Sequence, residues 1–383
     1  MKKYKMNYSI VLSIIIFTIL SCSKKELIEP ELVTVITIPE DYIAMRSEIL
    51  IDLGQNFIQP NIQNFKYSAF DLNSYAQLFT ATPNLSNLLA LQEKWKIVQN
   101  QWELNCLYHI GPVKDQYLFY KIDTWPTNMI FINNAVTGSD SIDNAFIESR
   151  GATSKGLPAI ENFVFDVVNG NQTVLDNFNT SIDSDRRKQY LNGLTINLYN
   201  QTIKIDSIWD ESRGDYYSSF VLSTENKISS AFNSHMNNLI ELLGYIVITK
   251  LEKPMGIISG TVTPTLAESY HSSNSFENIK QNILTLKGGF NGSLNGFGIN
   301  DLLDHKNAKS GTVFLSERIN QKLDSVAISI NNISSISVSD AVINEPVQMI
   351  SLLNHFKGLY DLMRIDVADA ADVIVTFSGN DGD

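Results

Sequence analysis

Residues 155–165 read KGLPAIENFVF, in which a glycine and a proline open a run of apolar residues. Pro158 fits the first turn of a helix, where the backbone N–H groups have no acceptor within the helix. Glu161 then falls within the first turns, where the helix dipole favours a carboxylate. The stretch therefore predicts an apolar helix that begins near Gly156 and carries one acidic side chain.

Apolar residues recur at helical spacing over much of the chain beyond Asp41, where we expect the folded part to begin. Helices are expected over residues 42–57, 88–107, 185–206, 216–250, 276–286, 308–331 and 352–371. Only Gly244 interrupts the fourth of them, and polar turns lie between the others. The fold class predicted from this pattern is all-α.

Two regions do not follow the helical pattern. Residues 287–299 contain five glycines and two phenylalanines, which indicates a long glycine-rich loop anchored by aromatic side chains. The loop lacks the Gly-Lys-Ser/Thr sequence of a phosphate-binding loop, so a connecting role is favoured. Residues 333–343 alternate serine with apolar residues, which is compatible with a short strand or a loop.

The N-terminus has the pattern of an export signal. Residues 1–21 contain three lysines followed by an apolar run too short to span a membrane, and residues 19–22 read ILSC. This resembles a bacterial lipoprotein signal peptide, which would make Cys22 the lipidated first residue of the mature chain, anchored at the membrane. An ordinary signal peptide or an N-terminal anchor helix is the alternative. Residues 22–40 are expected to form a tether.

Charge and cysteine content narrow the classes of function. The formal net charge is −12, which argues against nucleic-acid binding and against a basic membrane-binding patch. Cys106 is the second of two cysteines. Acylation of Cys22 would leave Cys106 without a disulfide partner, so we expect it to pack as a small buried apolar residue.

Linear signatures of hydrolases are missing. None of the five histidines belongs to a His-Glu-x-x-His sequence, and there is no Gly-x-Ser-x-Gly sequence. The sequence therefore supports no catalytic residue, and an enzymatic function is the less favoured interpretation.

Several short segments occur in the order typical of one known family. They are IDTWP at 122–126, residues 209–220, KPMG at 253–256, Glu268-Ser269 and Asp381-Gly382-Asp383. Together with residues 155–165, this order resembles the imelysin family, whose signature is Gly-x-His-x-x-Glu at the start of an apolar helix. Gly156 and Glu161 occupy signature positions, but Pro158 stands in place of the histidine. The histidine–glutamate pair that could share a metal ion therefore cannot form here.

The resemblance implies an all-α protein of two helical-bundle domains packed side by side. We place them at residues 41–210 and 211–383, with the glycine-rich loop in the second. Membership would also imply a protein of the cell envelope, periplasmic or at the outer membrane, with links to iron acquisition and a family name that refers to peptidase activity.

Candidate ligand-binding residues follow from the same segments. Gly156 and Glu161 are expected in a cleft between the two halves, near Asp123, Trp125 and Arg150, with Glu268 and Ser269 facing them from the second half. Glu161 is the candidate metal ligand, and oxygen ligands from Glu161, Asp123 or Glu268 would suit a hard cation such as ferric iron. The alternative is structural: Gly156, Pro158 and Glu161 shape a helix start, Asp123 caps a helix, and Arg150 pairs with Glu161 or Asp123 to hold the halves together.

These observations lead to one favoured function and two alternatives. We expect a lipid-anchored, non-catalytic binding component that takes up iron or an iron compound such as haem, together with an envelope uptake partner. A lipoprotein that binds a partner protein or a glycan is the first alternative, and a metallopeptidase is the second.

Overall fold

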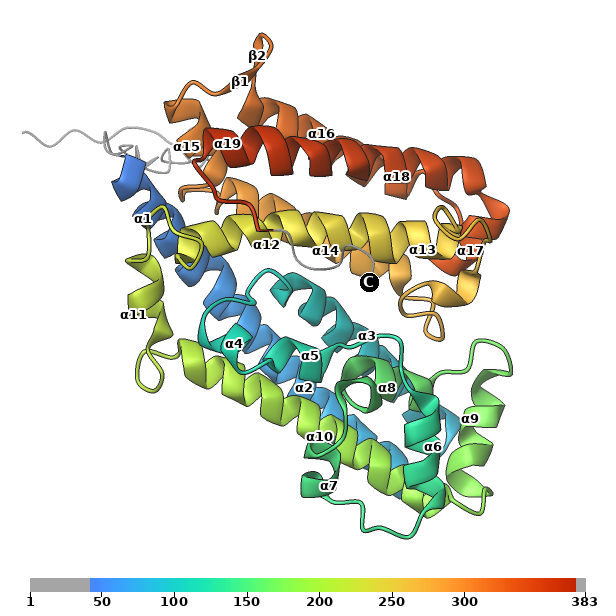
Figure 1. Cartoon of the computed structure of the whole chain (residues 1–383). Helices are drawn as coiled ribbons and strands as arrows, with labels where there is room; N and C mark the ends of the chain where they lie inside the picture. The colour runs from blue at the N-terminus through green and yellow to red at the C-terminus, as the bar shows by residue number, and fades with distance from the viewer. Residues whose placement is uncertain (1–41, 377–383) are drawn as a thin grey trace, which may run out of the picture. The chain divides into compact units, whose positions relative to one another are not determined.

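The computed structural model describes residues 42–376 (Figure 1). The expected signal peptide, Cys22, the tether and the terminal Asp381-Gly382-Asp383 lie outside the described residues. Within them the regular structure is nearly all helix, and the predicted all-α fold class is confirmed. One short hairpin interrupts the helices, in which the two-residue strands β1 (Lys309–Ser310) and β2 (Val313–Phe314) pair antiparallel.

Long helices form the frame of the first half. The α1 helix (Tyr42–Asp52) continues through a π-helical turn, η1 (Leu53–Ile58), into α2 (Gln59–Ala81). The α2 helix packs between α3 (Leu85–Asn105) and α10 (Ser184–Trp209). Short elements connect α3 to α10: α4 (Pro112–Asp115), α5 (Leu118–Ile122), α6 (Met129–Thr137), α7 (Asn144–Glu148), η2 (Ala152–Ser154), α8 (Gly156–Val164) and α9 (Gly170–Asn179).

The second half is a further set of packed helices. In chain order they are α11 (Tyr216–Val221), α12 (Ala231–Tyr245), η3 (Ile246–Glu252), α13 (Lys253–Met255), η4 (Pro264–Leu266), α14 (Ser275–Asn291), α15 (Ile299–His305), α16 (Leu315–Asn331), α17 (Val338–Asn344), α18 (Pro346–Asp361), η5 (Leu362–Val367) and α19 (Ala368–Ala370). The α16 and α18 helices pack together, and α14 contacts both α12 and α3. The contact between α14 and α3 brings residues from the two halves of the sequence together. The division at residue 210 stays a prediction, although α10 does end at Trp209.

The single helix expected over residues 216–250 is wrong. Two helices, α11 and α12, are separated by residues 222–230, and the Ser230 hydroxyl accepts a hydrogen bond from the Asn233 N–H to begin the second. Gly244 does not break α12, which continues directly into the π-helical turn η3. Helical spacing alone does not locate such a boundary, because both segments bury apolar side chains at similar intervals.

The predicted glycine-rich loop is shorter than expected, and the segment at 333–343 is mostly helical. Gly288 and Gly289 belong to α14, where the absence of a Cβ lets Phe57 and Leu107 approach the helix closely. Only residues 292–298 form the loop. Over residues 338–344 the chain forms α17, capped by the Ser337 hydroxyl, so neither the strand nor the loop interpretation holds there.

Two further observations concern membrane contact and redox chemistry. Across residues 42–376, no helix combines the length and the apolar character needed to cross a membrane. Cys106 is free and only half-buried, and its thiol donates a hydrogen bond to the Glu103 carbonyl oxygen. The expectation of a buried apolar cysteine is therefore met only in part.

Candidate functional site: a buried carboxylate cluster around Lys250

The α8 helix begins as predicted, and a close backbone contact fixes its position. Gly156 has a φ of +77°, and a Cβ added there would lie 2.2 Å from the Ile122 carbonyl oxygen. Only glycine accommodates both this backbone conformation and this contact. The N-terminus of α8 therefore packs against the end of α5, directly beside Asp123.

Glu161 ties α8 to a loop of the second half. Its side chain is buried, and Oε1 accepts a hydrogen bond of 2.8 Å from the backbone N–H of Ser272. Burial in the protein interior raises the pKa of Glu161 to about 7, although the hydrogen bonds from Ser272 oppose the shift. The loop that it binds carries Glu268 and Ser269, so two segments singled out in the sequence meet here.

Asp123 follows α5 and directs its carboxylate toward α3. Its Oδ2 accepts a hydrogen bond of 2.6 Å from the indole Nε1 of Trp102, a buried residue of α3. Burial raises the pKa of Asp123 well above its usual range, and the nearby carboxylates of Glu268 and Glu103 raise it further.

Lys250 lies between two buried glutamates. Its Nζ atom is 2.9 Å from Oε2 of Glu103 and 2.8 Å from Oε2 of Glu268. The three side chains are only 2%, 3% and 6% exposed, respectively. The two carboxylates raise the pKa of the Lys250 ammonium despite its burial, whereas burial raises the pKa of Glu103. Lys250 belongs to the π-helical turn η3, a backbone form that recurs at functional sites.

Two asparagine side chains on α14 form hydrogen bonds to these charged groups. Asn282 donates to Oε2 of Glu103 at 2.7 Å and accepts from Lys250 at 2.8 Å. One turn earlier, Asn278 donates to Oε2 of Glu268 and to the Ser269 hydroxyl, both at 2.9 Å. The helical spacing of four residues therefore presents two amides to two glutamates.

The arrangement favours a small, hard cation. Carboxylate oxygens of Glu103, Asp123 and Glu268 lie within 4.8 Å of one another, with Asp123 half-buried and both glutamates buried. Glu161 stands beside this set, close enough for Glu268 to influence its pKa. Two of these four carboxyl groups pair with the Lys250 ammonium, and the burial of the others requires bound protons or another cation. Oxygen donors of this kind suit hard cations.

The structure brings together most of the residues predicted from the sequence. Asp123, Gly156, Glu161, Glu268 and Ser269 all lie at the cluster, while Trp125 is half-buried in the segment after Asp123. The ion pair expected between Arg150 and Glu161 or Asp123 does not form among the described residues. The Arg150 guanidinium instead lies 4.2 Å from the centre of the Phe146 ring and donates to the Phe146 carbonyl oxygen.

The sequence patterns did not identify Glu103 and Lys250 as site residues. A signal existed for each, because both are charged residues inside apolar helical stretches. Glu103 follows Trp102 on the buried face of α3, and Lys250 lies among Val247 and Leu251. A charged side chain on an apolar face needs a partner.

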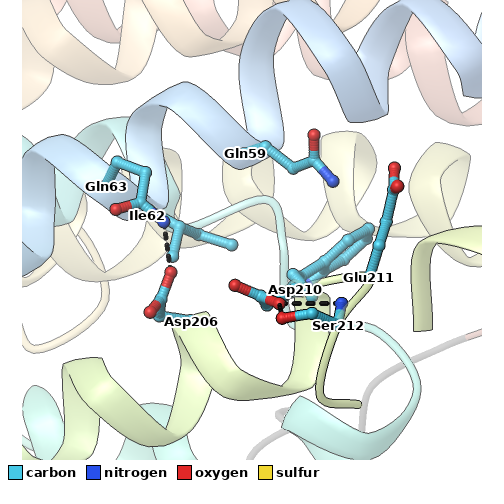
Figure 2. A pocket seen from close by; sticks show the side chains of 8 residues that line it. Gln59, Ile62, Gln63, Asp206, Asp210, Glu211 and Ser212 are labelled. Atoms are coloured by element: carbon cyan, nitrogen blue, oxygen red, sulfur yellow. Dashed lines mark hydrogen bonds between the residues drawn. The ribbon is translucent and has the colours of Figure 1, made fainter. Parts of the chain in front are cut away.

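A separate surface pocket of about 410 Å³ lies between α2 and the end of α10 (Figure 2). Its lining residues are Gln59, Ile62, Gln63, Asp206, Trp209, Asp210, Glu211 and Ser212. Asp206 binds Gln63 inside the pocket and forms ion pairs with Lys66 and Arg213 at its edge. The buried carboxylate of this pocket, Asp206, is therefore paired with two cationic side chains.

Comparisons with known proteins agree with this architecture. The imelysin (peptidase M75) family model matches residues 58–361. The chain belongs to the imelysin family. Pro158 thus marks a member in which the signature histidine is replaced, while the glycine and glutamate of the signature keep the positions described above.

Relatives of this imelysin-family chain include iron-regulated protein A of Synechococcus elongatus. The two are 22% identical over 232 residues, which cover 59% of this chain and 58% of the relative. The match therefore spans less than two thirds of that relative's length.

Two crystal structures share the fold. One, of a protein named iron-regulated protein A precursor from Parabacteroides distasonis, has a TM-score of 0.68 at 14% identity; the match covers 88% of this chain and 96% of that one. The other, an imelysin-like protein from Psychrobacter arcticum, has a TM-score of 0.67 at 13% identity and covers 89% of this chain and 100% of that one.

Proposed function

We propose that this imelysin-family protein is a non-catalytic binding component that takes up iron, and that Glu103, Asp123 and Glu268 hold it. The observation that carries the proposal is the convergence of three carboxylates within 4.8 Å of one another. The names of the Synechococcus relative and of the Parabacteroides structure connect those proteins with iron, which supports this choice of cation.

The donor set fits ferrous or ferric iron chemically. Carboxylate oxygens are hard donors, and a multivalent cation compensates the negative charge that forms when these groups lose their protons. Binding to Asp123 requires that its carboxyl group lose its proton, because the folded protein raises its pKa. Iron uptake is therefore expected to release protons and to strengthen as the pH rises.

Location in the cell envelope is the second part of the proposal. The ILSC sequence at residues 19–22 supports lipidation of Cys22, which would anchor the binding component at a membrane beside an uptake partner. Metabolic labelling with a fatty acid, compared between the wild type and Cys22→Ser, tests this part. Loss of the label in the variant is expected, and an unlabelled wild type would contradict it.

Calorimetric titration tests the binding part. Ferrous iron, ferric citrate, haem and zinc are titrated separately into the wild type and into Glu268→Gln. Saturable binding of iron that the variant loses is expected. Asp206→Asn is the matched control, because Asp206 is an equally buried carboxylate with cationic partners in the surface pocket. Binding that survives in Glu268→Gln, or none to any form of iron, would contradict the proposal.

A second candidate function rests on exposed aromatic residues in the segments before and after Asp123 in the sequence. The side chains of Tyr117, Tyr120 and Phe131 are 67%, 53% and 60% exposed, and large exposed apolar groups mark interaction sites. They favour a protein or glycan partner over a metallopeptidase. A pull-down from envelope extract, with Tyr117→Ser/Tyr120→Ser as the comparison, separates this function from iron binding, since neither tyrosine belongs to the carboxylate cluster.

A further inference from the structure

We propose that the Lys250 ammonium group occupies the carboxylate site in the metal-free protein, and that a single metal ion without a chelator binds by displacing it. This inference rests on the proposed function, since it assumes that the cluster takes up a cation. It adds that the bound species is a single metal ion and that Lys250 competes with this ion.

The position of the Lys250 ammonium is the first step. Its Nζ atom contacts one carboxylate oxygen each of Glu103 and Glu268, at 2.9 and 2.8 Å. These same residues supply two of the three oxygens that could hold a metal. An ammonium and a metal ion cannot occupy this space together, so the two cations must compete.

The distances also indicate how the site would adapt. Oxygens that surround an ammonium stand about 2.8 Å from its nitrogen, whereas a small divalent cation draws oxygens to about 2.1 Å. Three carboxylate oxygens within 4.8 Å of one another are compatible with the larger ammonium group. Replacing Lys250 with a metal would therefore draw the three carboxylates closer together.

Asn282 gives the displaced ammonium somewhere to remain. Its Oδ1 already accepts a hydrogen bond of 2.8 Å from Lys250, while its Nδ2 donates to Glu103. The ring of Tyr245 lies 5.7 Å from the same ammonium. A shift of Lys250 toward these groups would keep part of its hydrogen bonding and cation–π attraction.

Burial decides the size of the cargo. The side chains of Lys250, Glu103 and Glu268 are at most 6% exposed, and Asp123 is the partly exposed member of the set. We expect a small ion to enter on the Asp123 side, whereas a haem or a ferric chelate could not contact Glu103 without opening the packing between α3 and α14. The cargo is therefore a single ion that has shed its chelator.

Removal of the competing cation provides the test. Ferrous sulfate is titrated calorimetrically, without oxygen, into the wild type, Lys250→Met and Lys66→Met. Lys66 is the matched control, because it also pairs with a buried carboxylate, at 2.8 Å, but in the surface pocket. Lys250→Met is expected to bind iron about tenfold more tightly or better, the factor that corresponds to one lost charge-assisted hydrogen bond. Lys66→Met is expected to match the wild type.

The outcomes separate this inference from the proposed function. If the wild type binds iron and Lys250→Met binds it no more tightly, the competition is excluded while the proposed function stands. If only Lys250→Met binds iron, Lys250 does block the site, and the native function is not iron uptake. If neither protein binds iron, both ideas are overturned.

A measurement on the wild type covers the case in which Lys250→Met does not fold. The ammonium group of a buried, ion-paired lysine gives a distinct signal in ¹⁵N-lysine NMR spectra because its protons exchange slowly. Adding zinc, a diamagnetic ion, should remove or shift this single signal in proportion to the bound metal. A signal that persists unchanged at saturation would overturn the proposal.

Discussion

The Glu161 carboxylate accepts a hydrogen bond of 2.8 Å from the backbone N–H of Ser272, 111 residues later in the chain. This contact joins the signature helix α8 to the loop that carries Glu268, a partner of Lys250. The signature glutamate therefore helps to position the carboxylate cluster, even though Pro158 has replaced the histidine of the motif. The same contact gives Glu161 a structural role and places it beside the candidate binding site.

Protonation of Glu161 should make stability depend on pH. The pKa is raised from 4.5 to about 7 in the folded protein, so between these values the native state retains a proton that the unfolded chain has lost. The free energy of unfolding should therefore fall as the pH rises through this window, by up to about 3 kcal/mol relative to Glu161→Gln. Urea unfolding at pH 4.5 and at pH 7.5 measures the difference. Parallel profiles for the two proteins would show that Glu161 does not retain its proton.

Substitution of Glu103 should destabilise the fold. Glu103→Gln preserves shape but leaves the Lys250 ammonium with one carboxylate, and loss of one partner of a buried ion pair costs about 3 kcal/mol. The exposed pair of Lys287 and Asp324 is the control, and Asp324→Asn should cost less than about 1 kcal/mol. Chemical denaturation of the three proteins checks both values. An equal cost for the two variants would mean that the buried pair contributes no more than a surface pair.

Gly156 should tolerate no side chain. Gly156→Ala combines a positive φ with a Cβ placed 2.2 Å from a backbone oxygen, and should cost about 2 kcal/mol or more. Gly170 has a similar φ of +78° but open space around its Cβ position, so Gly170→Ala should show the backbone strain alone, at about 1 kcal/mol. Thermal unfolding of both variants separates the two effects. A larger loss for Gly170→Ala than for Gly156→Ala would contradict the close contact with Ile122.

The Cys106 thiol should react slowly. Although the residue is half-buried, loss of hydration around its sulfur raises the thiol pKa well above the usual range, and the neighbouring Glu103 carboxylate raises it further, so little thiolate exists at neutral pH. In a Cys22→Ser background, the reaction with an aromatic disulfide reagent should be much slower in the native protein than in urea. Similar reaction rates in the native and the urea-unfolded protein would show that neither burial nor Glu103 raises the pKa of the thiol.

The sequence was a good guide to fold class because apolar residues at helical spacing extend over long segments. Boundaries were harder to predict where two helices follow one another with similar apolar faces, as between α11 and α12, or where glycines continue a helix. Gly288 and Gly289 looked like part of a loop, yet the close packing of Phe57 and Leu107 explains their presence in α14.

The site was predicted in part, for a related reason. Segments with a distinctive order pointed to Asp123, Glu161 and Glu268, which the fold brings together. Glu103 and Lys250 lie in stretches that look like ordinary helix, and their pairing joins residues 147 positions apart. Arg150 was expected at the cluster because a partly buried arginine needs a partner, but the Phe146 ring and carbonyl oxygen supply it locally.

Diffraction at the iron absorption edge tests the central claim most directly. Crystals of the protein soaked with ferrous iron in the absence of oxygen should show one anomalous peak enclosed by Glu103, Asp123 and Glu268, with the Lys250 ammonium displaced toward Asn282. An iron peak elsewhere, for example beside Asp210 and Glu211 in the surface pocket, would contradict the account. So would crystals that contain no bound iron and retain Lys250 between its two glutamates.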